Sequence, residues 1–284
     1  MVGFDAGWQV AFERGEDVWI SRADGRSAHL VARRATAPSW SRDGRKIAFL
    51  RKDGAWICNG DGSAAHRVWR GHASSLSWHP SGLRLAISAR LSRGEAILDV
   101  NLKTGTAAVF AGLSGWDTGT GFTFSGNAAP EWSADGRSLA FSRNGDVWLA
   151  TAYNLPGERA GWEVYRLVAA ANFDAPTYRG SRENEEAYRF SWSRDGKRLA
   201  YAVRRKGGSG TANVSVVHLR NDGTVAKTEP IMPQSSVFDP AFASDGTTLT
   251  FTRYDEGQQD FDLVLVGKRF FHNVSRPAWR PVTG

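Results

Sequence analysis

The stretch "PSWSRDGRKIAFL", residues 38–50, returns in altered form along the chain. Close repetitions are "EWSADGRSLAF" at residues 131–141 and "SWSRDGKRLAY" at residues 191–201. Each phrase carries an aromatic residue just before an Asp-Gly or Ser-Gly pair, and a last copy near the end of the chain lacks this pair. These anchor aromatics are Trp40, Trp78, Trp132, Trp192, Phe242 and Trp279. A phrase that recurs at long intervals indicates a structural unit and not a catalytic motif.

Each repeat predicts four short β-strands. The anchor aromatic ends an apolar strand, and the Asp-Gly that follows is a hairpin-turn signal because glycine accepts the positive φ of such turns. An alternating strand comes next, as in residues 46–49, and then a third strand such as "DVWIS" at residues 17–21. A second glycine turn leads to a short outer strand. Four-stranded units of about 40–50 residues around one axis are the blades of a β-propeller.

The two ends of the chain predict how the ring closes. Residues 8–12 match a second strand, so the first unit lacks its inner strand, while residues 276–279 match an inner strand without the rest of a unit. Pairing the two removes two sheet edges. We therefore expect an all-β protein with a single domain over residues 1–284. The expected fold is a six-bladed β-propeller of four-stranded antiparallel blades, with the C-terminal strand paired to the N-terminal blade.

The phrase W-S-x-D-G-x-x-[IL]-A-F resembles the WD40-like PD40 repeat of TolB-like six-bladed β-propellers. The resemblance covers essentially the whole chain and implies a bacterial protein of this fold. The fold is shared by the periplasmic TolB protein, by propeller domains of prolyl-oligopeptidase-type peptidases and by oligogalacturonate lyases. The resemblance therefore leaves the function open, because one fold hosts many functions.

Composition narrows the class of protein. The chain has 284 residues, of which 41% are hydrophobic, as is typical of a globular protein with a substantial core. The sequence contains no apolar run long enough to cross a bilayer, and its first residues lack the basic and apolar regions of a signal peptide. We expect a cytoplasmic protein, or a periplasmic or exported one if a signal has been removed. The single cysteine, Cys58, excludes an internal disulfide and is interpreted as a buried core thiol.

The formal net charge of +7 favours an acidic partner. A nucleic-acid partner is not predicted, because the sequence has no run of five or more basic residues and no known nucleic-acid-binding motif. It also lacks the H-E-x-x-H, Walker A and G-x-S-x-G motifs. Of the six scattered histidines, only His72 and His272 fall in loops expected at the channel. We therefore expect no metal, no cofactor and no catalytic residue.

An arginine stands near the end of the second strand of every predicted blade: Arg14, Arg51, Arg90, Arg143, Arg204 and Arg253. In a propeller, this strand end and the loops that enter the inner strand surround the mouth of the central channel. A ring of arginines there would form a positive funnel for a carboxylate, a phosphate or an acidic peptide. The alternative is that they are solvated charges paired with loop acids such as Glu16, Asp53 or Asp255.

A second group of charges occupies the position three residues before the anchor. In three adjacent blades this position is Arg189, Asp239 and Arg276, and we expect it at the channel-facing end of the inner strand. The three residues form either a salt-bridged brace between blades or an anion site. By contrast, the aspartates of the repeated phrase are assigned to hydrogen bonds within their own turns: Asp43, Asp135, Asp195 and Asp245.

Two long insertions, residues 112–129 and 169–189, have no equivalent in the other repeats. Both lie in loops expected on the channel face, and long loops in compact folds are often functional. The insertions provide Trp116 and Tyr188 as candidate binding residues. The alternative is that the loops only cover the rim.

These observations favour a monomeric, non-enzymatic binding propeller that presents a basic channel face to an acidic protein segment or a small anionic ligand. The alternative is an enzyme, a lyase or hydrolase, that acts on an acidic carbohydrate or a related anion at the channel mouth. A third hypothesis, ranked last, is the propeller of a sensor or peptidase whose other domain lies outside this chain.

Overall fold

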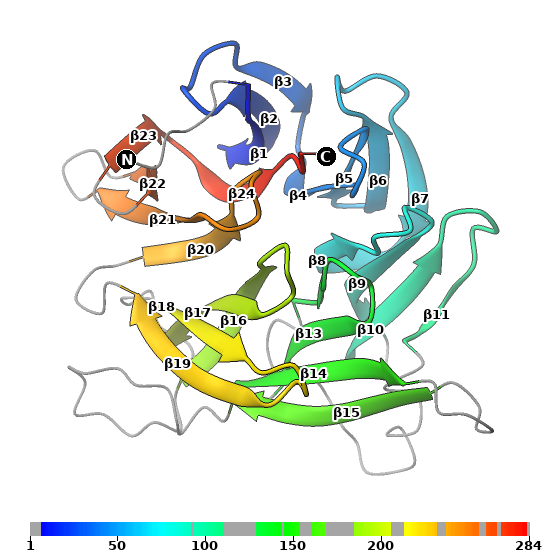
Figure 1. Cartoon of the computed structure of the whole chain (residues 1–284). Helices are drawn as coiled ribbons and strands as arrows, with labels where there is room; N and C mark the ends of the chain where they lie inside the picture. The colour runs from blue at the N-terminus through cyan, green and yellow to red at the C-terminus, as the bar shows by residue number, and fades with distance from the viewer. Residues whose placement is uncertain are drawn as a thin grey trace.

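The computed structural model describes residues 7–91, 94–110, 129–143, 145–153, 161–168, 185–205, 213–231, 237–255, 260–265 and 268–282. Their strands form six four-stranded sheets arranged in a ring around a central axis (Figure 1). Within every sheet, neighbouring strands pair antiparallel. The predicted all-β, six-bladed propeller is therefore confirmed.

Each blade begins with an inner strand at the channel and ends with an outer strand at the rim. In this order, the closing blade contains β24 (Ser275–Trp279), β1 (Gln9–Arg14), β2 (Asp17–Arg22) and β3 (His29–Ala32). The next contains β4 (Thr36–Trp40), β5 (Lys46–Arg51), β6 (Gly54–Asn59) and β7 (His66–Arg70). The third contains β8 (His72–Trp78), β9 (Arg84–Leu91), β10 (Gly94–Asn101) and β11 (Ala107–Val109).

The remaining three blades follow the same order. One contains β12 (Glu131–Trp132), β13 (Ser138–Arg143), β14 (Asp146–Tyr153) and β15 (Gly161–Val168). The next contains β16 (Glu185–Trp192), β17 (Arg198–Arg205), β18 (Asn213–Leu219) and β19 (Val225–Ile231). The last contains β20 (Val237–Phe242), β21 (Leu249–Asp255), β22 (Asp260–Leu265) and β23 (Lys268–His272).

The ring closes as the sequence predicts. Strand β24, from the end of the chain, pairs with β1, and Val10 lies opposite Trp279 in this register. The indole Nε1 of Trp279 also donates to Thr250 Oγ1 of the preceding blade at 2.9 Å. Two parts of the chain that are far apart in sequence thus complete one sheet, which removes two exposed edges.

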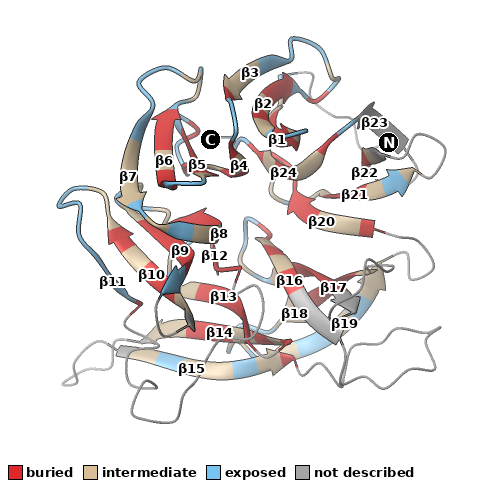
Figure 2. Ribbon diagram, turned by 180° about the vertical axis from the view of Figure 1, so that it is seen from behind, coloured by how far each residue is buried: buried red, intermediate tan, exposed pale blue. Residues whose placement is uncertain are grey.

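The hydrophobic core lies between the blades. Ile47, Ala48 and Phe49 of β5 are all fully buried, because the second strand of a blade is covered on both faces by its neighbours. One core cluster combines Leu50 of β5 with Leu85 of β9 in the adjacent blade. In Figure 2, buried residues lie mainly on the inner and middle strands of each blade and exposed residues mainly on the outer strands. The free thiol of Cys58 belongs to this core and is 2% exposed, so its predicted burial is confirmed.

The repeated Asp-Gly pairs close turns by the predicted chemistry. Asp43 Oδ1 accepts from Ser41 Oγ at 2.6 Å and from the Arg45 amide at 3.1 Å. Gly44 has a φ of 64°, a conformation that glycine adopts without steric cost. The Ser41 hydrogen bond is the main cause of the lowered pKa of Asp43. Asp135 and Asp195 accept the equivalent serine bond, and Asp245 instead accepts from Thr248 Oγ1.

Candidate functional site

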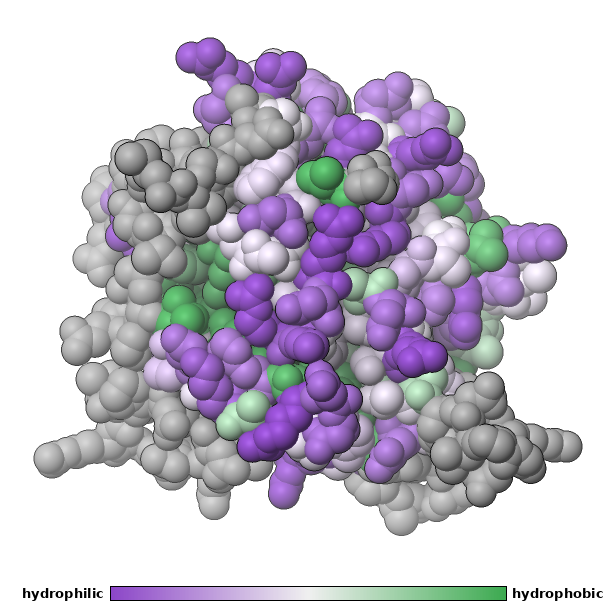
Figure 3. Space-filling model, in the orientation of Figure 1, coloured by the Kyte–Doolittle hydropathy of each residue, from purple (hydrophilic) through white to green (hydrophobic). Residues whose placement is uncertain are grey.

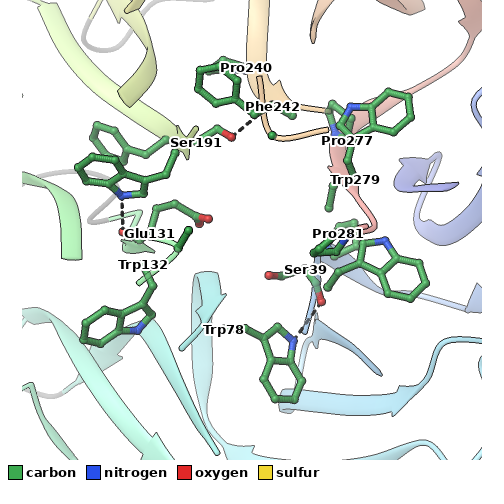
Figure 4. A pocket seen from close by; sticks show the side chains of 18 of the residues that line it. Ser39, Trp78, Glu131, Trp132, Ser191, Pro240, Phe242, Pro277, Trp279 and Pro281 are labelled. Atoms are coloured by element: carbon green, nitrogen blue, oxygen red, sulfur yellow. Dashed lines mark hydrogen bonds between the residues drawn. The ribbon is translucent and has the colours of Figure 1, made fainter. Parts of the chain in front are cut away.

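A cavity of about 250 Å³ lies at the centre of the ring, and all six inner strands line it (Figure 4). The anchor aromatics form part of its wall, and their hydrogen bonds tie neighbouring blades together. Trp78 Nε1 donates to the carbonyl of Ser39 at 3.1 Å, and Trp192 Nε1 donates to the carbonyl of Glu131 at 3.2 Å. These aromatics therefore belong to the scaffold of the channel, as the repeat predicts.

The residue three before the anchor has an unusual backbone conformation in five of the six blades. The residues with positive φ at this position are Ala37, Ala129, Arg189, Asp239 and Arg276. Such φ values are uncommon outside glycine and carry a conformational cost. In four of these five blades a register shift interrupts the pairing of the inner strand at this residue. Since a bulge redirects a side chain, the fold itself aims this position at the channel.

The bulge brings the three predicted charges together and adds an acid that the sequence analysis missed. Arg189 Nε lies 3.2 Å from Asp239 Oδ1, and Arg276 Nη1 lies 3.1 Å from Glu13 Oε1. Asp239 Oδ2 also accepts the backbone amide of Arg276 at 3.0 Å. Glu13 in turn accepts the amide of Ala37 at 2.5 Å. This channel network, Glu13, Arg189, Asp239 and Arg276, links four consecutive blades, so its contacts are those of the predicted brace.

Glu13 could have been recognised from the sequence, because it differs from the residues at the same place in the other blades. Glu13 is 9% exposed and precedes Arg14 in β1. At the corresponding place the other second strands carry apolar or small polar residues: Leu50, Ser88, Ser142, Ala202 and Thr252. A carboxylate in a buried strand requires a cationic or hydrogen-bonding partner.

The channel network lies between two cavities. A second cavity of about 270 Å³ is lined by Glu13, by Tyr188 and by the first residues of several inner strands. Ser75, Arg189 and Arg276 line both cavities, which places them at the boundary. The candidate residue Tyr188 is 7% exposed and lines this second cavity.

The second-strand arginines have a different setting. The guanidinium of Arg51 lies 4.6 Å from the ring centre of Trp56, and that of Arg143 lies 5.1 Å from Trp148. Arg14 is placed in the same way, 5.6 Å from Trp19. These are cation–π contacts with the third strand of the same blade, a partner that the sequence analysis did not consider.

Strand pairing locates the other candidates. Arg90 is exposed and lies opposite His72 and Glu95, and Arg253 lies opposite Asp262. Arg204 lies in β17, but its side chain is outside the described residues, as is the whole of Trp116. Among the described second-strand arginines, none lines either central cavity. A binding role for this ring remains a prediction.

The cavity has its own cations, which stand inside the repeated phrase. The residue two after the anchor lines it in all six blades: Arg42, Pro80, Ala134, Arg194, Ser244 and Pro281. Arg42 and Arg194 are both exposed, and their blades lie opposite each other in the ring. With Arg189 and Arg276 they outnumber the two lining acids, so the cavity is positive. The sequence analysis assigned this part of the phrase to blade geometry and therefore missed them.

One lining acid, Glu131, stands apart from the channel network. Its carboxyl group points into the open centre of the cavity (Figure 4). Burial raises the pKa of Glu131 to about 8, although a hydrogen bond with Ser77 acts in the opposite direction. In the other blades the same position is serine or alanine: Ser39, Ser77, Ser191, Ala241 and Ala278. This difference from the other blades was the feature of the sequence that could have marked Glu131 as a candidate.

Hydrophilic residues predominate over the described part of the face in Figure 3. Within the described ranges, no group of three or more His, Cys, Asp or Glu side chains is arranged to hold a metal ion. In this same part of the chain, no helix has the length and apolar character needed to cross a bilayer.

The fold and its closure define a six-bladed β-propeller whose architecture is similar to that of TolB structures. Among solved structures, the chain is similar to TolB from Acinetobacter baumannii, with 18% identity and a TM-score of 0.69, over 98% of this chain and 68% of that one. It is also similar to a chain of a nidogen–laminin complex, with 9% identity and a TM-score of 0.60, over 96% and 98% of the two chains. A chain of a mitotic checkpoint complex matches with 16% identity and a TM-score of 0.52, over 92% and 87%. No protein-family model and no curated protein matches the sequence. These TM-scores establish a shared fold, and at identities this low the function has to be argued from the site.

Proposed function

We propose that the protein is a non-enzymatic binding propeller whose basic central channel binds an acidic protein segment or a small anionic ligand. The observation that carries this proposal is the set of arginines lining the central cavity: Arg42, Arg189, Arg194 and Arg276. Guanidinium groups are well suited to carboxylates and phosphates because they donate paired hydrogen bonds.

The four arginines have distinct parts in this proposal. Arg189 and Arg276 are held in fixed positions by Asp239 and Glu13, so they form an ordered floor for the cavity. Arg42 and Arg194 are exposed at opposite sides of the mouth and attract the anion as it approaches. The ring closes with its own strands, so we propose that a single chain is sufficient for binding.

Solved complexes with this architecture support the proposal by analogy only. The nidogen–laminin complex and the mitotic checkpoint complex each contain a chain of similar fold. For this chain the argument rests on the charges in the channel, and the ligand chemistry follows from them.

The test uses a fluorescently labelled, N-acetylated hexaglutamate peptide as the probe, with anisotropy as the readout. We expect saturable binding at low salt that weakens strongly at about 0.3 M salt. The double variant Arg42→Glu, Arg194→Glu should lose at least about tenfold in affinity, because both charges at the mouth of the cavity are reversed. The matched control is Arg45→Glu, Lys197→Glu, which makes the same charge change in the same two turns outside the cavity lining.

The outcomes separate the possible sites. Equal losses in the two double variants would show that only net charge matters and would refute a channel site. If the double variant Arg51→Glu, Arg253→Glu loses affinity while Arg42→Glu, Arg194→Glu keeps full affinity, binding is assigned to the second-strand arginines instead. Succinate as a competitor distinguishes the two ligand sources, because a small-anion site is blocked by it and an extended segment site is not. Absence of saturable binding for both probes would overturn the proposal.

A further inference from the structure

Glu131 is a carboxyl group placed inside a cavity whose other charges are mostly positive. It comes from β12, at the position directly before the anchor, and it points into the centre of the channel (Figure 4). Within the described part of the chain, no basic side chain forms an ion pair with it. Glu131 is only partly exposed, and withdrawing a carboxylate from water without a cationic partner is costly, whereas the neutral acid at such a site is not.

The surroundings favour the neutral form. The charged groups that line the same cavity are Arg42, Arg189, Arg194, Arg276 and Asp239. None of these arginines is among the causes that shift the pKa of Glu131, which burial raises to about 8. His79, in the turn after β8, packs edge-on against Trp132, the residue that follows Glu131, with 4.7 Å between the ring centres. Burial lowers the pKa of His79 below 6.5, so this imidazole is uncharged where Glu131 titrates.

We propose that Glu131 acts in its protonated form, as the hydrogen-bond donor to a carboxylate oxygen of the ligand bound in the channel. This inference rests on the proposed function and narrows it, because it assigns a specific contact to the anionic ligand. The arginines attract and neutralise the anion, and Glu131 supplies a directed O–H donor on the wall where the other blades present serine or alanine. A deprotonated Glu131 would instead repel the same group.

The first experiment needs no ligand. A carbon-13 NMR titration of the side-chain carboxyl of Glu131, assigned by comparison with Glu131→Gln, follows its protonation directly. We expect a midpoint near pH 8, as for a carboxyl kept neutral by burial. A midpoint at the ordinary value near 4.5 would overturn the inference while leaving the proposed function standing.

The second experiment measures how binding of the hexaglutamate probe depends on pH. With a free-protein pKa of about 8, the affinity should fall about tenfold from pH 7 to pH 9, since the bound state needs the proton. The glutamates of the probe keep their charges over this range. The matched control Glu163→Gln makes the same change at an exposed position of β15 in the same blade and should retain the wild-type pH profile.

Two substitutions of Glu131 distinguish the effect of its hydrogen-bond donor from the effect of side-chain volume alone. Glu131→Gln keeps a donor that does not titrate, so its affinity should be several-fold below wild type at pH 7 and above wild type at pH 9. Glu131→Ala removes the donor and should bind weakly at both pH values. Binding by wild type that does not change between pH 7 and pH 9, or an identical profile in Glu131→Gln, would refute the inference although the proposed function would survive. Inorganic phosphate as a competitor tests the ligand class, because displacement by phosphate and not by succinate would contradict the carboxylate assignment.

Discussion

The channel network makes a quantitative prediction about stability. Asp239 balances Arg189 at 3.2 Å, and it accepts the amide of Arg276 and, at 3.3 Å, the hydroxyl of Thr252. The Arg189 side chain is 22% exposed, and burial, with repulsion from Arg276, lowers its pKa. Asp239→Ala would leave this guanidinium without its partner. Removing one member of a buried pair costs about 3–5 kcal/mol, and we expect about 3 kcal/mol because Arg189 keeps some solvent contact.

A double-mutant cycle measures this value by urea denaturation followed by tryptophan fluorescence. For a chain of this size, a loss of about 3 kcal/mol corresponds to a fall in Tm of roughly 6–12 °C. Asp239→Asn is the backbone control, because asparagine tolerates the φ of 42° at this position as aspartate does. The double variant Asp239→Ala, Arg189→Met removes the uncompensated charge and should recover at least about half of the lost free energy.

Two results would refute the reasoning. A loss of less than about 1 kcal/mol in Asp239→Ala would mean that solvent already screens Arg189. Purely additive effects of the two substitutions would mean that the pair does not hold the blades together, whatever each residue does alone.

Three further predictions concern single side chains. Burial raises the pKa of Glu131 from 4.5 to about 8. The stability that its neutral form confers should therefore be complete below pH 4.5 and lost by about pH 8, a change of a few kcal/mol in the free energy of unfolding. Urea titrations of Glu131→Gln should lack this decline, and an unaltered decline would contradict the assignment. Burial also raises the pKa of Cys58 to about 11, so a thiol reagent at about pH 8 should react only as fast as the protein unfolds, and rapid labelling of native protein would disprove this. Trp279→Phe removes the hydrogen bond to Thr250 and should cost about 1–2 kcal/mol more than Trp132→Phe, whose Nε1 has no hydrogen-bond partner among the described groups; equal unfolding free energies would count against the bond.

The architecture could be predicted because its determinants are local. An anchor aromatic, an Asp-Gly turn and an alternating strand each follow from a few neighbouring residues, and their repetition forces stacking around an axis. Ring closure was also predictable, since the incomplete units at the two ends complement each other. The aspartates of the turns, such as Asp43, needed only their own turn to be assigned correctly.

The binding candidates depended on side-chain direction, which is a tertiary property. The grouping of Arg189, Asp239 and Arg276 was predictable from their common place before the anchor, but Glu13 joins them only because ring closure pairs β1 with β24, the strand that carries Arg276. Arg51 lies at the expected strand end, yet its guanidinium stacks on Trp56 of the next strand.

The repeated phrase itself shows the division most clearly. The sequence alone determined that residues 38–50 form an inner strand, a turn and a second strand, because local propensity and turn chemistry specify these elements. Only the tertiary structure decided that Arg42, within this phrase, reaches a cavity shared with Glu131 from a blade two places along the ring. The two-residue alternation along a strand predicts which side chains share a face, but the bulges and the closure of six sheets around one axis decide which side chains come into contact.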